Sequence, residues 1–128
     1  MKTSILKSKI KRNNLEGLAG EYFRDDTSQL VCDLNKEGKR ALFGIQREDG
    51  IYTIIGREFV YYSTISGVKK EIPLDFFEKK MHINAAKKGK RAKYEFLRID
   101  EDKEVWLNNK LTMEALWNII IWLEKESE

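Results

Sequence analysis

The stretch KRALFGIQREDGIYTII, residues 39–55, decides the class of fold that this sequence predicts. Apolar and β-branched residues recur in both halves of the stretch, and Glu48-Asp49-Gly50 separates them. An Asp-Gly pair between two such halves favours a hairpin turn, because glycine accepts the positive φ that these turns require. We therefore expect strands over Lys39–Arg47 and Ile51–Ile55, paired as an antiparallel hairpin.

Further strands are expected on both sides of this hairpin. Short runs rich in apolar or β-branched residues occupy 21–24, 29–34, 58–65, 93–99 and 104–107. Turn residues follow most of these runs, and Gly56 predicts a bulge or a break. Short strands joined by short turns, such as Ser66-Gly67 and the acidic 100–103, predict an antiparallel β-meander of about six or seven strands.

Two helices complete an α+β prediction. Pro73 suits a first helical turn, and the residues that follow it at helical spacing are Leu74, Phe77, Met81 and Ala85. A helix is therefore expected over about 73–88, ending before Gly89. A second helix is expected over about 112–125, with Thr112 as its N-cap. This second helix is apolar nearly all round, which predicts burial under other elements or a homodimer interface.

The first fourteen residues are the least determined part of the sequence. They are polar and basic with isolated apolar residues, which is compatible with a first strand, a short helix or a loosely ordered basic arm over 1–14. Residues 15–20, LEGLAG, predict a short turn of helix or a loop. With 128 residues and no linker or internal repeat, the chain is expected to form a single domain over 1–128.

Cysteine usage and hydropathy predict a cytoplasmic location. Cys32 is the one cysteine, so no intramolecular disulfide can form, which favours a reducing compartment. The basic N-terminal region contains no apolar stretch typical of a signal peptide. The longest apolar run, Ile119–Leu123, is much too short for a membrane span, so no membrane partner is expected.

No set of residues in the sequence indicates catalysis. His82 is the one histidine, and a metal site needs several converging ligands. Phosphate-loop and nucleophile-elbow motifs are absent from the sequence. The acidic run that begins at Asp100 has Val105 and Leu111 where a calcium loop needs glycine and glutamate. We therefore expect no enzymatic activity, no cofactor and no metal, with His82 in a structural or surface role.

Two charged groups of residues are candidates for binding. The acidic group lies in predicted turns, either solvated or in contact with a basic partner: Glu48, Asp49, Asp100, Glu101, Asp102 and Glu104. The basic group is either a solvated helix end or a contact for nucleic-acid phosphates: Lys87, Lys88, Lys90, Arg91 and Lys93. The net charge of +3 is too small to diagnose nucleic-acid binding.

Six aromatic residues of the predicted strands also help to distinguish a protein partner from a nucleic-acid partner. They could act as base-stacking platforms or form the core, and we expect at least four of them to be core: Tyr22, Phe43, Tyr52, Tyr61, Tyr62 and Tyr94. Burial of these aromatics together with clustered acidic turns would favour a protein partner. A surface that combines the basic group with the aromatics would favour nucleic acid.

The segments EVWLNN (104–109) and TMEALWNIIIWLE (112–124) resemble the ending of small immunity proteins from bacterial contact-dependent growth inhibition and polymorphic toxin systems. This resemblance implies a cytosolic toxin inhibitor that binds a cognate toxin C-terminal domain, often a nuclease, by stoichiometric protein–protein association. It assigns no binding residues, because the matching positions are core-type. The alternative is a single-stranded nucleic-acid-binding module that uses the Lys87–Lys93 group and the strand aromatics.

Overall fold

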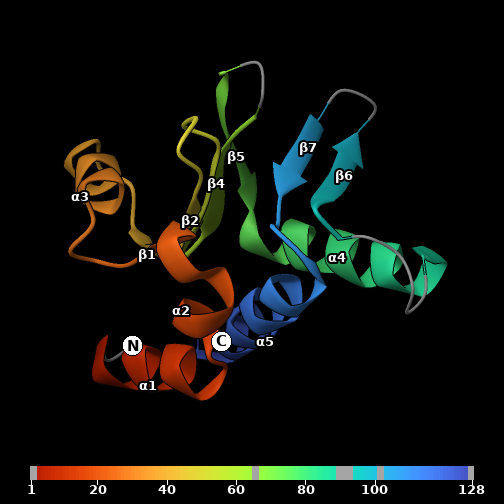
Figure 1. The fold of residues 1–128 in the computed structure, drawn as a ribbon, viewed down its shortest axis with the longest axis horizontal. Coiled ribbons are helices and arrows are strands. Elements are labelled where there is room, and N and C mark those ends of the chain that lie inside the picture. Colours follow the sequence, from red (N-terminus) through yellow and green to blue (C-terminus); the bar gives the residue numbers. More distant parts are fainter. Residues whose placement is uncertain (1–2, 65–66, 89–93, 101–102, 127–128) are drawn as a thin grey trace.

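The computed structural model describes residues 3–64, 67–88, 94–100 and 103–126, and its class is the predicted α+β (Figure 1). A five-stranded antiparallel sheet keeps the chain order β1 (Phe23–Arg24), β2 (Ala41–Gln46), β3 (Tyr52–Gly56), β4 (Phe59–Ser63) and β5 (Lys69–Pro73). A separate antiparallel hairpin contains β6 (Phe96–Asp100) and β7 (Lys103–Trp106). The predicted meander is thus confirmed, although its strands are divided between two sheets.

Five α-helices of the described residues surround the larger sheet: α1 (Thr3–Arg12), α2 (Leu15–Ala19), α3 (Gln29–Lys36), α4 (Leu74–Lys88) and α5 (Lys110–Glu126). A short 3₁₀ turn, Gly20–Tyr22, joins α2 to β1. Helix α3 lies on one side of the sheet, and the β6–β7 hairpin, α4 and α5 lie on the other (Figure 1). The sheet is therefore covered on both faces.

Alternation along the strands sends side chains to two hydrophobic clusters. The smaller cluster joins α3 to one sheet face and contains Val31, Leu34, Ala41, Tyr52, Ile54 and Tyr61. The opposite face contributes Phe43, Ile45, Ile55, Val60 and Tyr62 to the main core. That core also includes buried residues of α1, α2, α4, α5 and the β6–β7 hairpin.

The predicted β2–β3 hairpin is confirmed, and a glycine in β2 allows its tight packing. Gly50 has a φ of +93° in the turn, where an L side chain would be strained. A Cβ on Gly44 would lie 2.1 Å from the carbonyl oxygen of Thr53, so only glycine fits there. The register shift of this pair lies between Ala41 and Phe43, on the strand opposite Gly56.

The strand predicted over Gln29–Leu34 is wrong, because these residues form helix α3. Val31 and Leu34, three positions apart, lie on one helical face and are buried against the sheet. The turn before the helix is fixed by Asp25, whose side chain accepts hydrogen bonds from the main-chain N–H and the hydroxyl of Thr27. A short apolar run is compatible with either a helix or a strand. Here the helix forms because it buries Val31 and Leu34 against the sheet.

The starts of the two predicted helices need correction. Pro73 ends β5, an edge strand that the sequence did not indicate, and α4 begins at Leu74. Asn109 caps α5 through a 2.9 Å hydrogen bond from the main-chain N–H of Thr112 to its side-chain oxygen. Thr112 itself is fully buried inside α5. The predicted residues Ser66, of a turn, and Gly89, of a helix end, lie outside the described residues.

Both ends of the described chain are helical and pack together. Of the three structures compatible with 1–14, a helix forms over Thr3–Arg12, and it buries Leu6 and Ile10 one turn apart. The buried face of α5 packs against α1, α2 and α4 of the same chain. In the described part of the chain, no helix combines the length and hydropathy needed to cross a membrane.

Candidate functional site

The acidic turns lie at one end of the molecule. The β2–β3 turn and the β6–β7 hairpin both point toward the top of Figure 1, as does the start of β5. Glu48, Asp49 and Glu104 are exposed, and Asp100 ends β6. The remaining two predicted residues, Glu101 and Asp102, lie outside the described residues.

Arg47 connects the β2–β3 turn to β7. Its guanidinium forms a 2.9 Å ion pair with Asp49 and lies 5.6 Å from the centre of the Trp106 ring. Asp49 also accepts a hydrogen bond from the main-chain N–H of Ile51, so its carboxylate is held in place. Glu48 forms no ion pair with a described residue. Lys69 adds positive charge at the same end, so the surface combines both signs.

The strand aromatics belong to the core. Five of the six are buried: Phe43, Tyr52, Tyr61, Tyr62 and Tyr94. Burial also raises the pKa of the Tyr52 and Tyr61 hydroxyls. Tyr22 is half-buried and stands edge-on to Trp106, with ring centres 5.3 Å apart. The prediction of at least four core aromatics is confirmed, and these five rings are not available for base stacking.

The basic group continues beyond the end of α4. Lys87 is exposed and Lys88 is the last helical residue, whereas Lys90, Arg91 and Lys93 lie outside the described residues. Tyr94, which follows them in the sequence, is buried. Because these aromatics are buried, they form no common surface with exposed Lys87.

His82 and Cys32 do not form a common site. His82 is exposed on α4, and its ring stands edge-on to Trp117 with the ring centres 5.9 Å apart. Cys32 is half-buried in α3, on the opposite side of the sheet (Figure 1). Among the described residues, no three His, Cys, Asp or Glu side chains are grouped so as to hold a metal ion.

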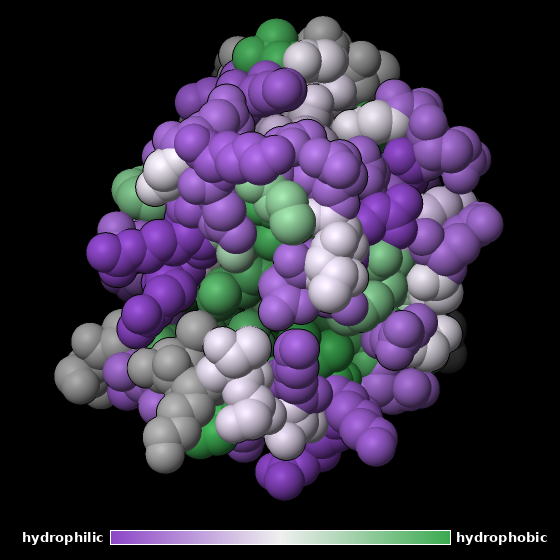
Figure 2. Space-filling model, turned by 90° about the vertical axis from the view of Figure 1, so that its left-hand side faces the viewer, coloured by the Kyte–Doolittle hydropathy of each residue, from purple (hydrophilic) through white to green (hydrophobic). Residues whose placement is uncertain are grey.

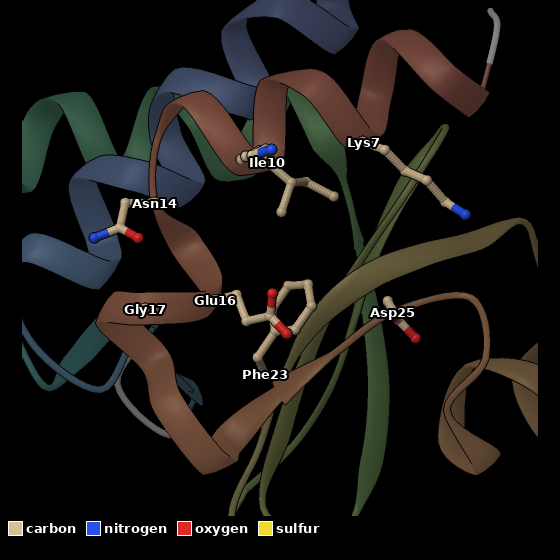
Figure 3. A pocket seen from close by; sticks show the side chains of 8 residues that line it. Lys7, Ile10, Asn14, Glu16, Gly17, Phe23 and Asp25 are labelled. Atoms are coloured by element: carbon tan, nitrogen blue, oxygen red, sulfur yellow. The ribbon is translucent and has the colours of Figure 1, made fainter.

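A groove beside α1 is the feature that the sequence did not indicate. It has a volume of about 350 Å³ between α1, α2 and β1 (Figure 3). A smaller hollow of about 90 Å³ continues it along α1 toward Thr3 and shares Lys7, Ile10 and Asp25 with it. Figure 2 shows this side of the molecule, where an apolar recess lies between hydrophilic borders. Its apolar lining residues include Leu6, Ile10, Phe23 and Leu42.

Charged side chains border the groove, and some of them are already paired. Lys7 on α1 forms a 3.7 Å ion pair with Asp26 on the opposite border. The hydroxyl of Thr27 donates a 2.6 Å hydrogen bond to Asp25, which lowers the pKa of that carboxyl below its usual value. Lys11 and Glu16, which also line the groove, form no ion pair with a described residue.

Asn14 and Gly17 shape the groove where α1 turns into α2. Asn14 has a left-handed backbone with a φ of 54°, which turns the chain sharply between α1 and α2. A Cβ on Gly17 would lie 2.4 Å from the side-chain oxygen of Asn14, so glycine lets the Asn14 amide lie against α2. The tight α1–α2 corner that results holds Lys11 and Glu16 on adjoining walls of one groove (Figure 3 labels Asn14, Glu16 and Gly17).

No protein-family model, curated protein or solved structure matches this chain. Two of its surfaces have features of binding sites. One is the end of the molecule with exposed Glu48, Asp49 and Glu104, which we call the acidic end although it also carries Arg47 and Lys69, and the other is the groove beside α1.

Proposed function

We propose that this protein is an immunity protein that binds a cognate toxin domain in the bacterial cytoplasm and neutralises it by stoichiometric association. The observation that carries the proposal is that the β2–β3 turn and the strands of the β6–β7 hairpin, which expose Glu48 and Glu104, lie at one end of the molecule while the strand aromatics are buried. The resemblance of residues 104–109 and 112–124 to immunity proteins supports the same function. Buried aromatics weigh against the alternative of a single-stranded nucleic-acid-binding module.

The acidic end suits a basic partner such as a nuclease domain. Exposed Glu48 and Glu104 would attract the cationic surface that such a domain uses to hold nucleic-acid phosphates. Arg47 holds the β2–β3 turn against β7 through Asp49 and Trp106, so the turn is already ordered before binding. Prior order lowers the entropic cost of association.

Binding to the product of the adjacent upstream gene tests the proposal. We expect the two proteins to co-purify and to form a complex of fixed stoichiometry in calorimetry. The double variant Glu48→Lys/Glu104→Lys should slow association about tenfold at low salt, with a smaller effect at high salt. Glu114→Lys, at an exposed position of α5, is the matched control and should leave the association rate unchanged. If the adjacent gene encodes no toxin, or if the proteins do not bind, the proposal is wrong.

A further inference from the structure

The groove beside α1 has the length of a short extended peptide. Its lining on α1 runs from Thr3 to Lys11, which are eight positions apart and so span about 12 Å at 1.5 Å per helical residue. An extended chain advances by about 3.3 Å per residue, so about four residues fit along this length. The groove is open along this side of the molecule, where Figure 2 shows the recess facing solvent.

The apolar part of the groove lining matches the centre of a protein interface, and its charged residues match the rim. Such interfaces have an apolar centre and a polar rim, and large side chains inserted into pockets supply most of the affinity. Here Ile10 and Phe23 form apolar parts of the main hollow, and Leu42 continues them in the smaller one. A volume of about 350 Å³ accommodates a large apolar side chain of a partner together with part of its backbone.

The charged residues on the rim of the groove indicate which residues of a partner would flank its apolar side chain. Asp25 accepts hydrogen bonds from Thr27, and Asp26 forms an ion pair with Lys7. Lys11 and Glu16 form no ion pair with a described residue. They lie on different walls, Lys11 on α1 and Glu16 on α2, so the rim offers one positive and one negative charge. A segment with an acidic residue facing Lys11 and a basic residue facing Glu16 complements both charges.

We infer that the groove beside α1 is the docking site for an extended segment of the toxin domain, in which one large apolar side chain is flanked by an acidic and a basic residue. This inference rests on the proposed function. Because α1 and α2 lie at the opposite end of the molecule from the acidic end (Figure 1), a toxin domain that contacts both surfaces must extend along the molecule. The acidic end accelerates the encounter, and the groove slows dissociation.

Charge reversal in the groove tests the inference with the toxin domain as the probe. We expect Lys11→Glu and Glu16→Lys each to weaken binding by about tenfold, mainly through faster dissociation. Lys9→Glu is the matched control, because Lys9 lies on the same helix but its ammonium lies 6.0 Å from the centre of the Trp122 ring, outside the groove lining. Its affinity should stay within twofold of the wild type. Thermal unfolding of each variant establishes that the fold is retained.

Amide hydrogen exchange provides a second measurement. Toxin binding should slow exchange in α1, α2 and β1, whereas an interface confined to the acidic end would protect only the β2–β3 turn and the β6–β7 hairpin. If the groove variants bind like the wild type while Glu48→Lys/Glu104→Lys weakens binding, the groove inference is overturned and the proposed function stands. If the wild type does not bind the toxin domain, both are overturned.

Discussion

The hydroxyl of Thr53 donates a 2.6 Å hydrogen bond to the main-chain carbonyl oxygen of Trp106. Thr53 is fully buried on β3, and Trp106 is a buried residue of β7. The two strands belong to different sheets, which share no strand pairing among the described residues. This bond therefore fixes the β6–β7 hairpin against the larger sheet at one defined position.

Replacing Thr53 by valine should lower the free energy of unfolding by about 1–3 kcal/mol, because a buried carbonyl oxygen loses its donor while the shape of the side chain is kept. Urea denaturation monitored by tryptophan fluorescence measures the change. Thr53→Ser retains the hydroxyl and is the control, with a smaller loss expected. Equal stability of the Thr53→Val variant and the wild type would contradict this role for the hydroxyl.

Asn35 bonds to the main chain of Ala41 at the start of β2, which lies before the two β2 residues that pair with β1. Its side-chain oxygen accepts a 2.8 Å hydrogen bond from the N–H of Ala41, and its amide donates to the carbonyl oxygen of the same residue at 3.1 Å. Asn35→Ala should cost about 1–2 kcal/mol, since both main-chain groups lose their partner. Asn35→Asp keeps the acceptor and loses the donor, so chemical denaturation should place it between the alanine variant and the wild type.

Gly44→Ala should destabilise the protein by about 3 kcal/mol, because the new Cβ would collide with the main chain of β3. Gly38→Ala is the matched control: its Cβ would meet nothing within 4 Å, and only its φ of +87° is unfavourable. A cost of about 1–2 kcal/mol is expected there. Thermal and urea unfolding rank the two variants, and a larger loss at Gly38 would exclude close strand packing as the cause.

The stability conferred by Asp25 should depend on pH. Hydrogen bonds from Thr27 lower the pKa of this carboxyl in the folded protein below the 3.8 of an unperturbed aspartate. Its contribution is therefore present above about pH 4 and is lost as the pH falls through the lowered pKa. Thr27→Ala should raise the pKa of Asp25 toward 3.8, measured by NMR titration of the carboxyl carbon. The stability difference between Thr27→Ala and the wild type should shrink in acid, and a constant difference would contradict the linkage.

Elements with a local cause could be predicted from the sequence. The β2–β3 hairpin follows from Asp49-Gly50 between two apolar strands, and α4 and α5 follow from their helical spacing. Thr112 was a plausible cap by residue type, but Asn109 is three residues before it and its side chain reaches the free N–H. Residue preference alone does not decide between two capping residues that lie so close together.

Elements with a distant cause could not be predicted. Leu30, Val31 and Leu34 form a helix because a sheet face formed by Ala41, Ile54 and Tyr61 is available to cover them. Strand β5 contains Lys69, Lys70 and Glu71, whose charges suit an edge but hide the strand pattern. Helix α3 and strand β5 both depend on contacts with parts of the sheet that are distant from them in the sequence.

Of the two candidate surfaces, the acidic end could be predicted from the sequence and the groove could not. Exposure of Glu48, Asp49 and Glu104 was predictable, since acidic residues in turns are solvated. The groove was not, because its walls come from α1, α2, β1 with the residues that follow it, and β2. One signal was present in the sequence: Thr3–Arg12 combines two apolar residues one turn apart with four cations and no acidic residue. That pattern predicts an amphipathic helix, but it does not show what lies beside it.

The packing of α1 against α5 has a consequence for synthesis of the protein. Asn13, just after α1, receives a 3.3 Å hydrogen bond from Asn118 of α5, 105 positions later in the chain. Leu6 and Ile10 share one core with Leu116 and Ile119. During synthesis these early side chains cannot make their contacts with α5 until α5 has left the ribosomal exit tunnel, so the main core should close only after α5 has emerged. Nascent chains paused before α5 should then be sensitive to proteases and bound by chaperones, whereas chains from which α5 has emerged should resist digestion.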